Sequence, residues 1–135
     1  MAFCFDTDVM SAAIRPDPPI RLIRRLAAVP RDQQFTTSIT VGELIYGVAK
    51  KHSESLAGRV REITNRATAV LPFDRAAARV YGPLRAHLET EGKRLDEADL
   101  RIASIALVAD LTLVTGNVKH FSRVPGLRVE NWLEQ

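Results

Sequence analysis

Short apolar runs alternate with helical patterns along the whole chain. Apolar runs of this length, bounded by turn residues, are typical of strands buried in a parallel sheet. The runs that predict strands are Phe3–Phe5, Gln34–Ser38, Val70–Phe73, Leu111–Val114 and Leu127–Val129. Because helical segments separate them, we expect an α/β protein with a three-layer α/β/α architecture and a central, mainly parallel sheet of four to five strands.

The helical segments between these runs have recognisable ends. A brief helix is expected directly after Phe5, and longer helices are expected over residues 40–51, 55–68, 74–91 and 96–109. Asp74 is placed to cap the third of the longer helices at its start, and Gly92 to end it.

One further helix is predicted to begin at Ile20, after three prolines. Its apolar positions 20, 23 and 27 lie opposite a basic face that contains Arg21, Arg24 and Arg25. Plain solvation explains such a face, and contact with RNA is the alternative that the pattern leaves open.

Composition narrows the class of protein. The chain has 135 residues, 46% of them hydrophobic, which predicts a single domain over residues 1–135. A net charge of +3 is compatible with nucleic acid but too small to indicate it alone. The one cysteine, Cys4, lies in an apolar run and is predicted to be a core residue. Without a long apolar segment or a disulfide, we expect a soluble, cytoplasmic protein with no membrane association.

Polar side chains follow two of the predicted strands, at the edge where parallel sheets bind ligands. Asp6 and Asp8 come directly after the first strand, and Thr115 and Asn117 follow the strand that ends at Val114. Asp6 is predicted to be functional, although Asp is also a favoured helix cap. Asp8 could cap the helix or coordinate a ligand.

Asp99 is the most informative acidic residue. In the helix 96–109 it shares a face with Ile102, Ala103 and Ala106, so its carboxylate lies in line with the buried stripe. A carboxylate there is costly unless it is paired, capped or bound to a metal. Stabilisation by the helix macrodipole is the other explanation, and spacing does not decide between them. Asp96 caps the helix or helps to hold a metal.

Glu43 also has two interpretations. Thr40 and Glu43 have the spacing of a capping box, in which Glu43 would return to the backbone of the cap residue. A core stripe of Val41, Leu44, Ile45 and Val48 would direct Glu43 away from the core. However, Gly42 and Gly47 each cost about 1 kcal/mol in a helix interior, which indicates close approach of backbone or ligand. Periodicity leaves the role of Glu43 open.

Other chemistries have no motif in this chain. The three histidines lack metal-ligand spacing, no serine lies in a nucleophile elbow, and there is no glycine-rich phosphate loop.

Taken together, four ordered motifs resemble the PIN-domain toxins of the VapC group. The motifs are Asp6–Val9 after a strand, Thr40–Gly47, Asp96–Ala103 and Leu113–Phe121, and the ending Val124–Trp132 is also similar. The resemblance covers the whole chain, and four motifs in order are more specific than any one of them.

The resemblance implies a metal-dependent ribonuclease that is the toxin of a type II toxin-antitoxin pair. Asp6, Glu43 and Asp99 would form the acidic site, with Thr115 and Asn117 at its edge. Carboxylate oxygens suit Mg²⁺ or Mn²⁺, which would activate a water for attack on an RNA phosphodiester. Many relatives have an aspartate where Asn117 stands, so a second metal is in doubt, and Asp96 is the residue that could compensate.

The resemblance also implies two protein partners, a second copy of the chain in a homodimer and a cognate antitoxin of the VapB type. Two rival functions remain. The segment Phe5–Val9 is similar to the start of haloacid-dehalogenase-type phosphatases, in which Asp6 would be the nucleophile. The substitution at Asn117 alternatively suggests a non-catalytic module that binds RNA or protein on a degenerate PIN fold.

Overall fold

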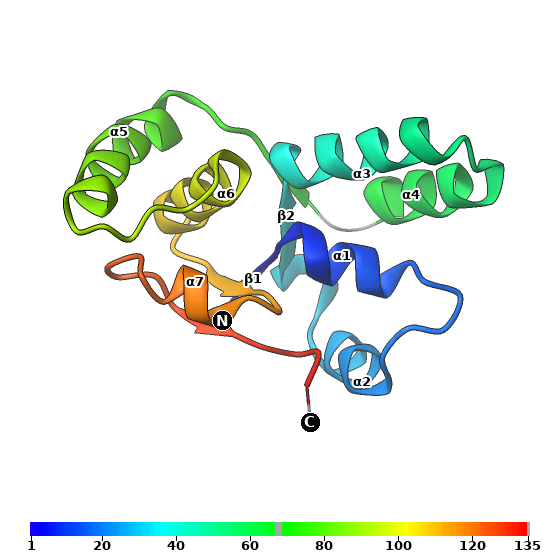
Figure 1. Ribbon diagram of the computed structural model, residues 1–135. Coiled ribbons are helices and arrows are strands. Elements are labelled where there is room, and N and C mark those ends of the chain that lie inside the picture. Colours follow the sequence, from blue (N-terminus) through cyan, green and yellow to red (C-terminus); the bar gives the residue numbers. More distant parts are fainter. Residues whose placement is uncertain (67–68, 135) are drawn as a thin grey trace.

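A five-stranded parallel sheet forms the centre of the protein in a computed structural model that describes residues 1–66 and 69–134 (Figure 1). The strands pair in the order β3-β2-β1-β4-β5, and all four pairings are parallel. The α/β fold class predicted from the sequence is therefore confirmed. The strands are β1 (Phe3–Phe5), β2 (Gln34–Thr37), β3 (Ala69–Leu71), β4 (Thr112–Val114) and β5 (Val129–Glu130).

Helices connect every consecutive pair of strands. The predicted helices are present, but the last two residues of the one expected over 55–68 lie outside the described residues. A 3₁₀ turn (Arg31–Gln33) and α7 are additional, and both are too short to produce a periodic pattern. No helix in the described ranges is long and apolar enough to cross a membrane. The helices are α1 (Thr7–Ala13), α2 (Ile20–Ala28), α3 (Ser38–Lys51), α4 (Glu54–Arg66), α5 (Arg75–Thr90), α6 (Glu97–Val108) and α7 (Val118–Phe121).

Alternation along β1 divides the core between the two faces of the sheet. Phe3 and Phe5 pack with residues of α1, α2 and α4 on one face, while Cys4 packs with residues of α5, α6 and α7 on the other. Figure 1 shows α5, α6 and α7 gathered on one side of the strands, opposite α1 and α2. Cys4 is fully buried, as predicted.

The strand order reverses direction at β1. After β1 the chain adds β2 and β3 on one side, and then crosses back through α5 and α6 to place β4 on the other side of β1. The connections that leave the carboxyl ends of β1 and β4 therefore diverge, and parallel sheets bind ligands at such a switch point. Asp6 follows β1 and Thr115 follows β4, so both lie at this switch point.

The stripe predicted for α2 is wrong. Ile20 and Ile23 are exposed, whereas the helix buries Leu22 and packs Leu26 and Val29 against the core. These three residues follow the i, i+4, i+7 spacing, one residue out of phase with the predicted stripe. The basic face is correspondingly rotated, which brings one of its arginines onto the sheet.

Arg25 is the arginine of α2 that contacts the sheet. Its guanidinium lies 4.7 Å from the ring centroid of Trp132 and 2.9 Å from the carboxylate of Glu130. The indole of Trp132 is fully buried and donates to the same carboxylate at 3.0 Å. This residue of the basic face therefore fastens the C-terminal segment to α2.

Two predicted helix ends of α5 are confirmed. Asp74 accepts a hydrogen bond from the Ala77 amide at 3.0 Å, which caps the start of the helix. At the other end, Gly92 adopts a φ of +68°, and Lys93 donates to the Leu88 carbonyl at 2.8 Å. This left-handed turn suits glycine and directs the chain back toward α6.

Candidate active site

Asp6 is a buried carboxylate at the switch point of the sheet. Its backbone amide donates to the Val114 carbonyl at 3.1 Å, which continues the pairing of β1 with β4 by one residue. Its side chain is 3% exposed and accepts from the Val9 amide at 3.0 Å, so Asp6 is the N-cap of α1. The capping interpretation is therefore correct, and the same group lies where a ligand would bind.

Thr115 and Asn117 border Asp6 from the end of β4. The Thr115 hydroxyl, fully buried, donates to the Asp6 carboxylate and accepts from the Asn117 amide at 2.9 Å. The side-chain oxygen of Asn117 contacts the Nδ1 atom of His120 one helical turn later. Thr115 thus contacts the carboxylate directly, whereas Asn117 lies at the edge of the site.

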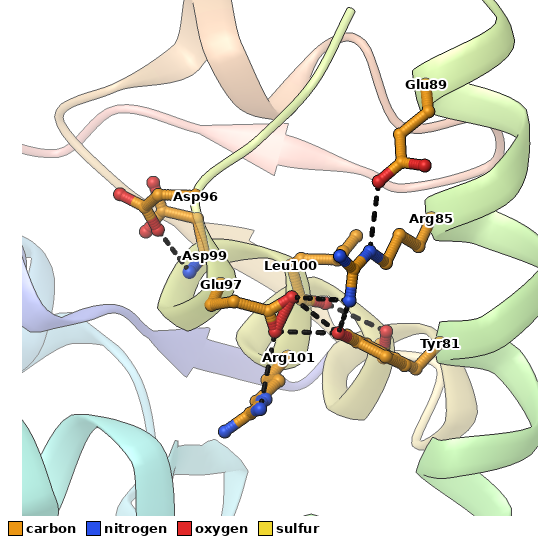
Figure 2. Close-up of polar contacts among 9 residues, drawn as sticks. Tyr81, Arg85, Glu89, Asp96, Glu97, Asp99, Leu100 and Arg101 are labelled. Atoms are coloured by element: carbon orange, nitrogen blue, oxygen red, sulfur yellow. Dashed lines mark hydrogen bonds and ion pairs between the residues drawn. The ribbon is translucent and has the colours of Figure 1, made fainter.

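The first turn of α6 brings a second pair of acidic residues to the site. Asp96 is the N-cap, and its Oδ1 atom accepts from the Asp99 amide at 2.8 Å (Figure 2). Asp99 is therefore capped rather than being the cap. Its side chain is half-buried, which the stripe of Ile102, Ala103 and Ala106 predicted.

Glu97 points away from the site and fixes α6 against α5. Figure 2 shows its carboxylate among Tyr81, Arg85 and Arg101, on the opposite side of the turn from Asp96. The Tyr81 hydroxyl donates to the Glu97 carboxylate, and each guanidinium approaches it at 3.3 Å. Sequence patterns gave no indication of this cluster, because its members lie on separate helices.

Burial and the neighbouring acidic groups raise the pKa of Asp6 and of Asp99. Burial is the main cause that raises the pKa of Asp6 to about 6, with smaller contributions from Asp8 and Glu43. Burial also raises the pKa of Asp99 to about 7, followed by the charges of Asp96, Asp6, Glu43 and Asp8. Burial and the neighbouring carboxylates therefore both disfavour the ionised form of Asp99.

Glu43 reaches the site by a different local structure from the one predicted. The N-cap of α3 is Thr37, which accepts from the Thr40 amide at 3.1 Å, so Thr40 and Glu43 do not form a capping box. Instead the Glu43 carboxylate accepts from the Thr7 hydroxyl at 2.5 Å. The predicted box failed because the helix begins two residues earlier, at Ser38.

One expectation for the core stripe of α3 is also wrong, and of the two explanations for its glycines the structure excludes the close approach of protein backbone. Ile45 is 55% exposed, and Thr40 and Leu44 are the residues that the helix buries. A side chain at Gly42 or Gly47 would meet nothing within 4 Å, so neither glycine is required by a close approach of the protein backbone.

The carboxylate oxygens of the site are ligands that suit a hard divalent cation, although they do not lie close enough together to form a complete metal site. None of the ion pairs among the described residues involves Asp6, Asp8, Glu43, Asp96 or Asp99. A buried carboxylate without a positive partner is unfavourable unless a cation neutralises it. As the described side chains stand, however, no three of them form a group that could hold a metal ion.

Comparison with known proteins agrees with this arrangement. The model of the PIN domain matches residues 3–127, a range that contains Asp6, Glu43 and Asp99. The chain belongs to the PIN-domain family. It is 32% identical to Ribonuclease VapC2 of Rickettsia felis and 33% identical to the tRNA(fMet)-specific endonuclease VapC of Shigella flexneri, with 98% of each chain covered in both comparisons.

The fold comparison confirms the resemblance to the VapC group. The crystal structure of VapBC2 from Rickettsia felis bound to a DNA fragment from its promoter contains a chain that superposes with a TM-score of 0.86 at 32% identity. The superposition covers 98% of this chain and 99% of that chain. Because PIN-domain membership accounts for all four motifs, the phosphatase alternative, which explained only Phe5–Val9, is set aside.

Two substitutions at Asp96 separate its two possible roles. Asp96→Asn keeps the capping acceptor, so we expect an unchanged melting temperature, whereas Asp96→Ala should cost about 1 kcal/mol. If Asp96 acts only beside the ligands, Asp96→Asn should raise the Kd for Mg²⁺ by roughly 10- to 100-fold at most, and by less than Asp99→Asn does. Calorimetric titration of both variants and of Asp99→Asn measures this. A loss in Asp96→Asn equal to that in Asp99→Asn would make Asp96 a direct ligand.

The raised pKa values predict how stability changes with pH. Between about pH 4 and pH 7 the folded protein holds protons on Asp6 and Asp99 that the unfolded chain releases. The free energy of unfolding should therefore fall as pH rises through this window. In EDTA, we expect a higher melting temperature at pH 5 than at pH 7.5.

Asp99→Asn tests the part of this effect that belongs to Asp99. At pH 7.5 in EDTA it should melt about 2–4 °C above the wild type, an estimate discounted because the side chain is only half-buried. Its melting temperature should also fall less between pH 5 and pH 7.5. Asp17→Asn, which removes one charge from an exposed loop, is the matched control. A lower melting point for Asp99→Asn would contradict the electrostatic account.

Proposed function

We propose that this protein is a metal-dependent endoribonuclease and the toxin of a type II toxin-antitoxin pair. The observation that carries the proposal is the group of carboxylates without positive partners at the β1/β4 switch point. The relatives that match over nearly the whole chain are named ribonucleases and endonucleases, which supports the choice of RNA as the substrate.

Asp6, Asp99 and Glu43 are the residues that would hold Mg²⁺ or Mn²⁺, and Asp96 is the additional candidate. When bound, the cation supplies an activated water for attack on the phosphodiester and offsets the charge that develops on the phosphate. Carboxylates bind such cations in their ionised form, so activity should rise with pH through the range in which Asp99 loses its proton.

The remaining residues of the site position these carboxylates. The Val9 amide and the Thr115 hydroxyl hold Asp6 in one orientation, and the Asp96 cap fixes the turn that carries Asp99. Thr7 donates to Glu43, and its hydroxyl also lies 3.3 Å from that of Thr40. Hydrogen bonds of this kind orient ligands and are often as important as the ligands themselves.

Asn117 favours a site with one cation. Its amide is neutral, and its oxygen contacts His120 rather than a carboxylate. A neutral amide is a weaker ligand for a hard cation than a carboxylate. The three acidic residues of the site are nevertheless all present, which argues against a non-catalytic module.

Two protein partners belong to the same proposal. Several structural neighbours are toxin-antitoxin complexes, among them VapBC2 from Rickettsia felis and VapBC from Salmonella typhimurium. We infer a cognate antitoxin of the VapB type for this chain, and a homodimer as its assembly. The cytoplasm, where its RNA substrate lies, is the proposed location.

The purified protein should cleave RNA with Mg²⁺ or Mn²⁺ and stop in excess EDTA. Asp6→Asn, Glu43→Gln and Asp99→Asn should each reduce the rate by about 100-fold or more, because each removes a charged group from the site. Cleavage of a labelled, structured RNA followed on denaturing gels measures this. Asp17→Asn should retain full activity.

Specific results would contradict this assignment. Undiminished cleavage in EDTA would exclude the metal mechanism. A fully active Glu43→Gln variant would remove Glu43 from the site and leave it only as the partner of Thr7.

Expression of the protein alone should arrest bacterial growth. A small partner encoded beside the gene should relieve the arrest when it is co-expressed, and Asp99→Asn should be harmless at equal abundance. Growth curves after induction, with immunoblots for protein level, measure this. Normal growth in the presence of soluble, folded wild-type protein would count against the toxin assignment.

A further inference from the structure

A groove runs beside the acidic site between α1, α3 and α4. It has a volume of about 410 Å³, and Glu43 forms part of its lining. Figure 1 shows α3 and α4 side by side, with α1 beneath them in this view. Leu44 and Leu56 contribute apolar surface to its walls. Glu43 lines this groove, and its carboxylate accepts from the hydroxyl of Thr7, which follows Asp6 in the chain, so the groove borders the candidate active site.

Three cationic side chains line the groove, one from each of the three segments that form its walls. Arg15 follows α1, Lys51 ends α3 and Arg59 lies in α4. None of the three takes part in an ion pair among the described residues. The Nε atom of Arg59 is buried and has no hydrogen-bond partner in the described structure. The groove therefore presents positive charge that the protein itself does not neutralise.

Gly47 keeps the α3 wall of the groove clear. It lies in the middle of α3, where glycine costs about 1 kcal/mol relative to alanine. A Cβ atom at this position would meet nothing within 4 Å, so packing does not require the glycine. The stability cost is explained if open space at this position serves a ligand.

We propose that this groove binds the RNA strand beside the scissile phosphate, with Arg15, Lys51 and Arg59 contacting backbone phosphates. The inference rests on the proposed ribonuclease function and assigns the substrate a path. Charge complementarity selects a polyanion over a neutral apolar peptide, and the apolar walls suit the face of an unpaired base. A single-stranded segment matches both features.

Charge reversal at Gly47 tests the proposal with little risk to folding. Gly47→Glu places a carboxylate in the groove, where nothing within 4 Å opposes the new side chain. Ala78→Glu in α5 is the matched control, since Ala78 is an exposed helical position outside the groove lining. Both changes are made in an Asp99→Asn background. Fluorescence anisotropy with a labelled, single-stranded RNA of ~12 nucleotides gives the Kd.

We expect Gly47→Glu to weaken RNA binding by about tenfold or more, and Ala78→Glu to change it less than twofold. Lys51→Gln and Arg59→Gln should each weaken binding roughly three- to tenfold and reduce the slope of log Kd against log salt by about 1. Arg24→Gln removes one exposed charge from α2 outside the groove and should have little effect. With Asp99 restored, Lys51→Gln should raise KM more than it lowers kcat.

The outcomes separate this assignment from the proposed function. If the wild type cleaves RNA while the groove variants keep full affinity and an unchanged KM, the groove assignment fails and the ribonuclease function stands. If Gly47→Glu leaves RNA affinity unchanged but abolishes relief by the co-expressed antitoxin, the groove belongs to the protein partner and the assignment is overturned. If the wild type fails to cleave RNA, the proposed function fails, and binding to the groove is judged by anisotropy alone.

Discussion

The buried carboxylate of Asp6 is the constraint on which the rest of the site depends. It ends β1, caps α1 and accepts from Thr115, so the strand, the helix and the neighbouring strand all meet at one side chain. Its pKa of about 6 shows that ionising it in this position is unfavourable. The fold supplies two hydrogen bonds to the group but no positive partner, and this imbalance is what makes the position suited to a cation.

A second cluster, formed by Glu97 with Tyr81, Arg85 and Arg101, holds the helix that carries Asp99. The first turn of α6 carries Asp99, and Glu97 in the same turn engages Tyr81 and Arg85 of α5 (Figure 2). This cluster is exposed, so each ion pair contributes little by itself. Its effect is directional, because it turns one carboxylate of α6 outward while Asp96 and Asp99 stay beside the site.

The sequence predicted the layers of the fold better than the local surroundings of the acidic residues. Strand and helix periods follow from local patterns, and Asp74 and Gly92 were readable as helix ends. The errors arose where contacts between distant segments determine the local structure. Trp132 and the sheet determine which face of α2 is buried. The cap of α3 is Thr37 rather than Thr40. The hydroxyl of Thr7 beside Glu43 joins residues 36 positions apart, which no local pattern reveals.

Helix α3 links the acidic site to the groove and explains why their charges are opposite. A polyanion that approaches Asp6, Glu43 and Asp99 is repelled, and a cation at the site offsets only part of that charge. Attraction supplied farther along the same helix, at Lys51, and from Arg15 and Arg59 allows the strand to bind without placing a positive side chain among the carboxylates. A lysine or arginine within the acidic group would pair with it and compete with the cation. The proposed groove thus separates substrate affinity from cation binding along α3, and Gly47 lies between Glu43 and Lys51 on that helix.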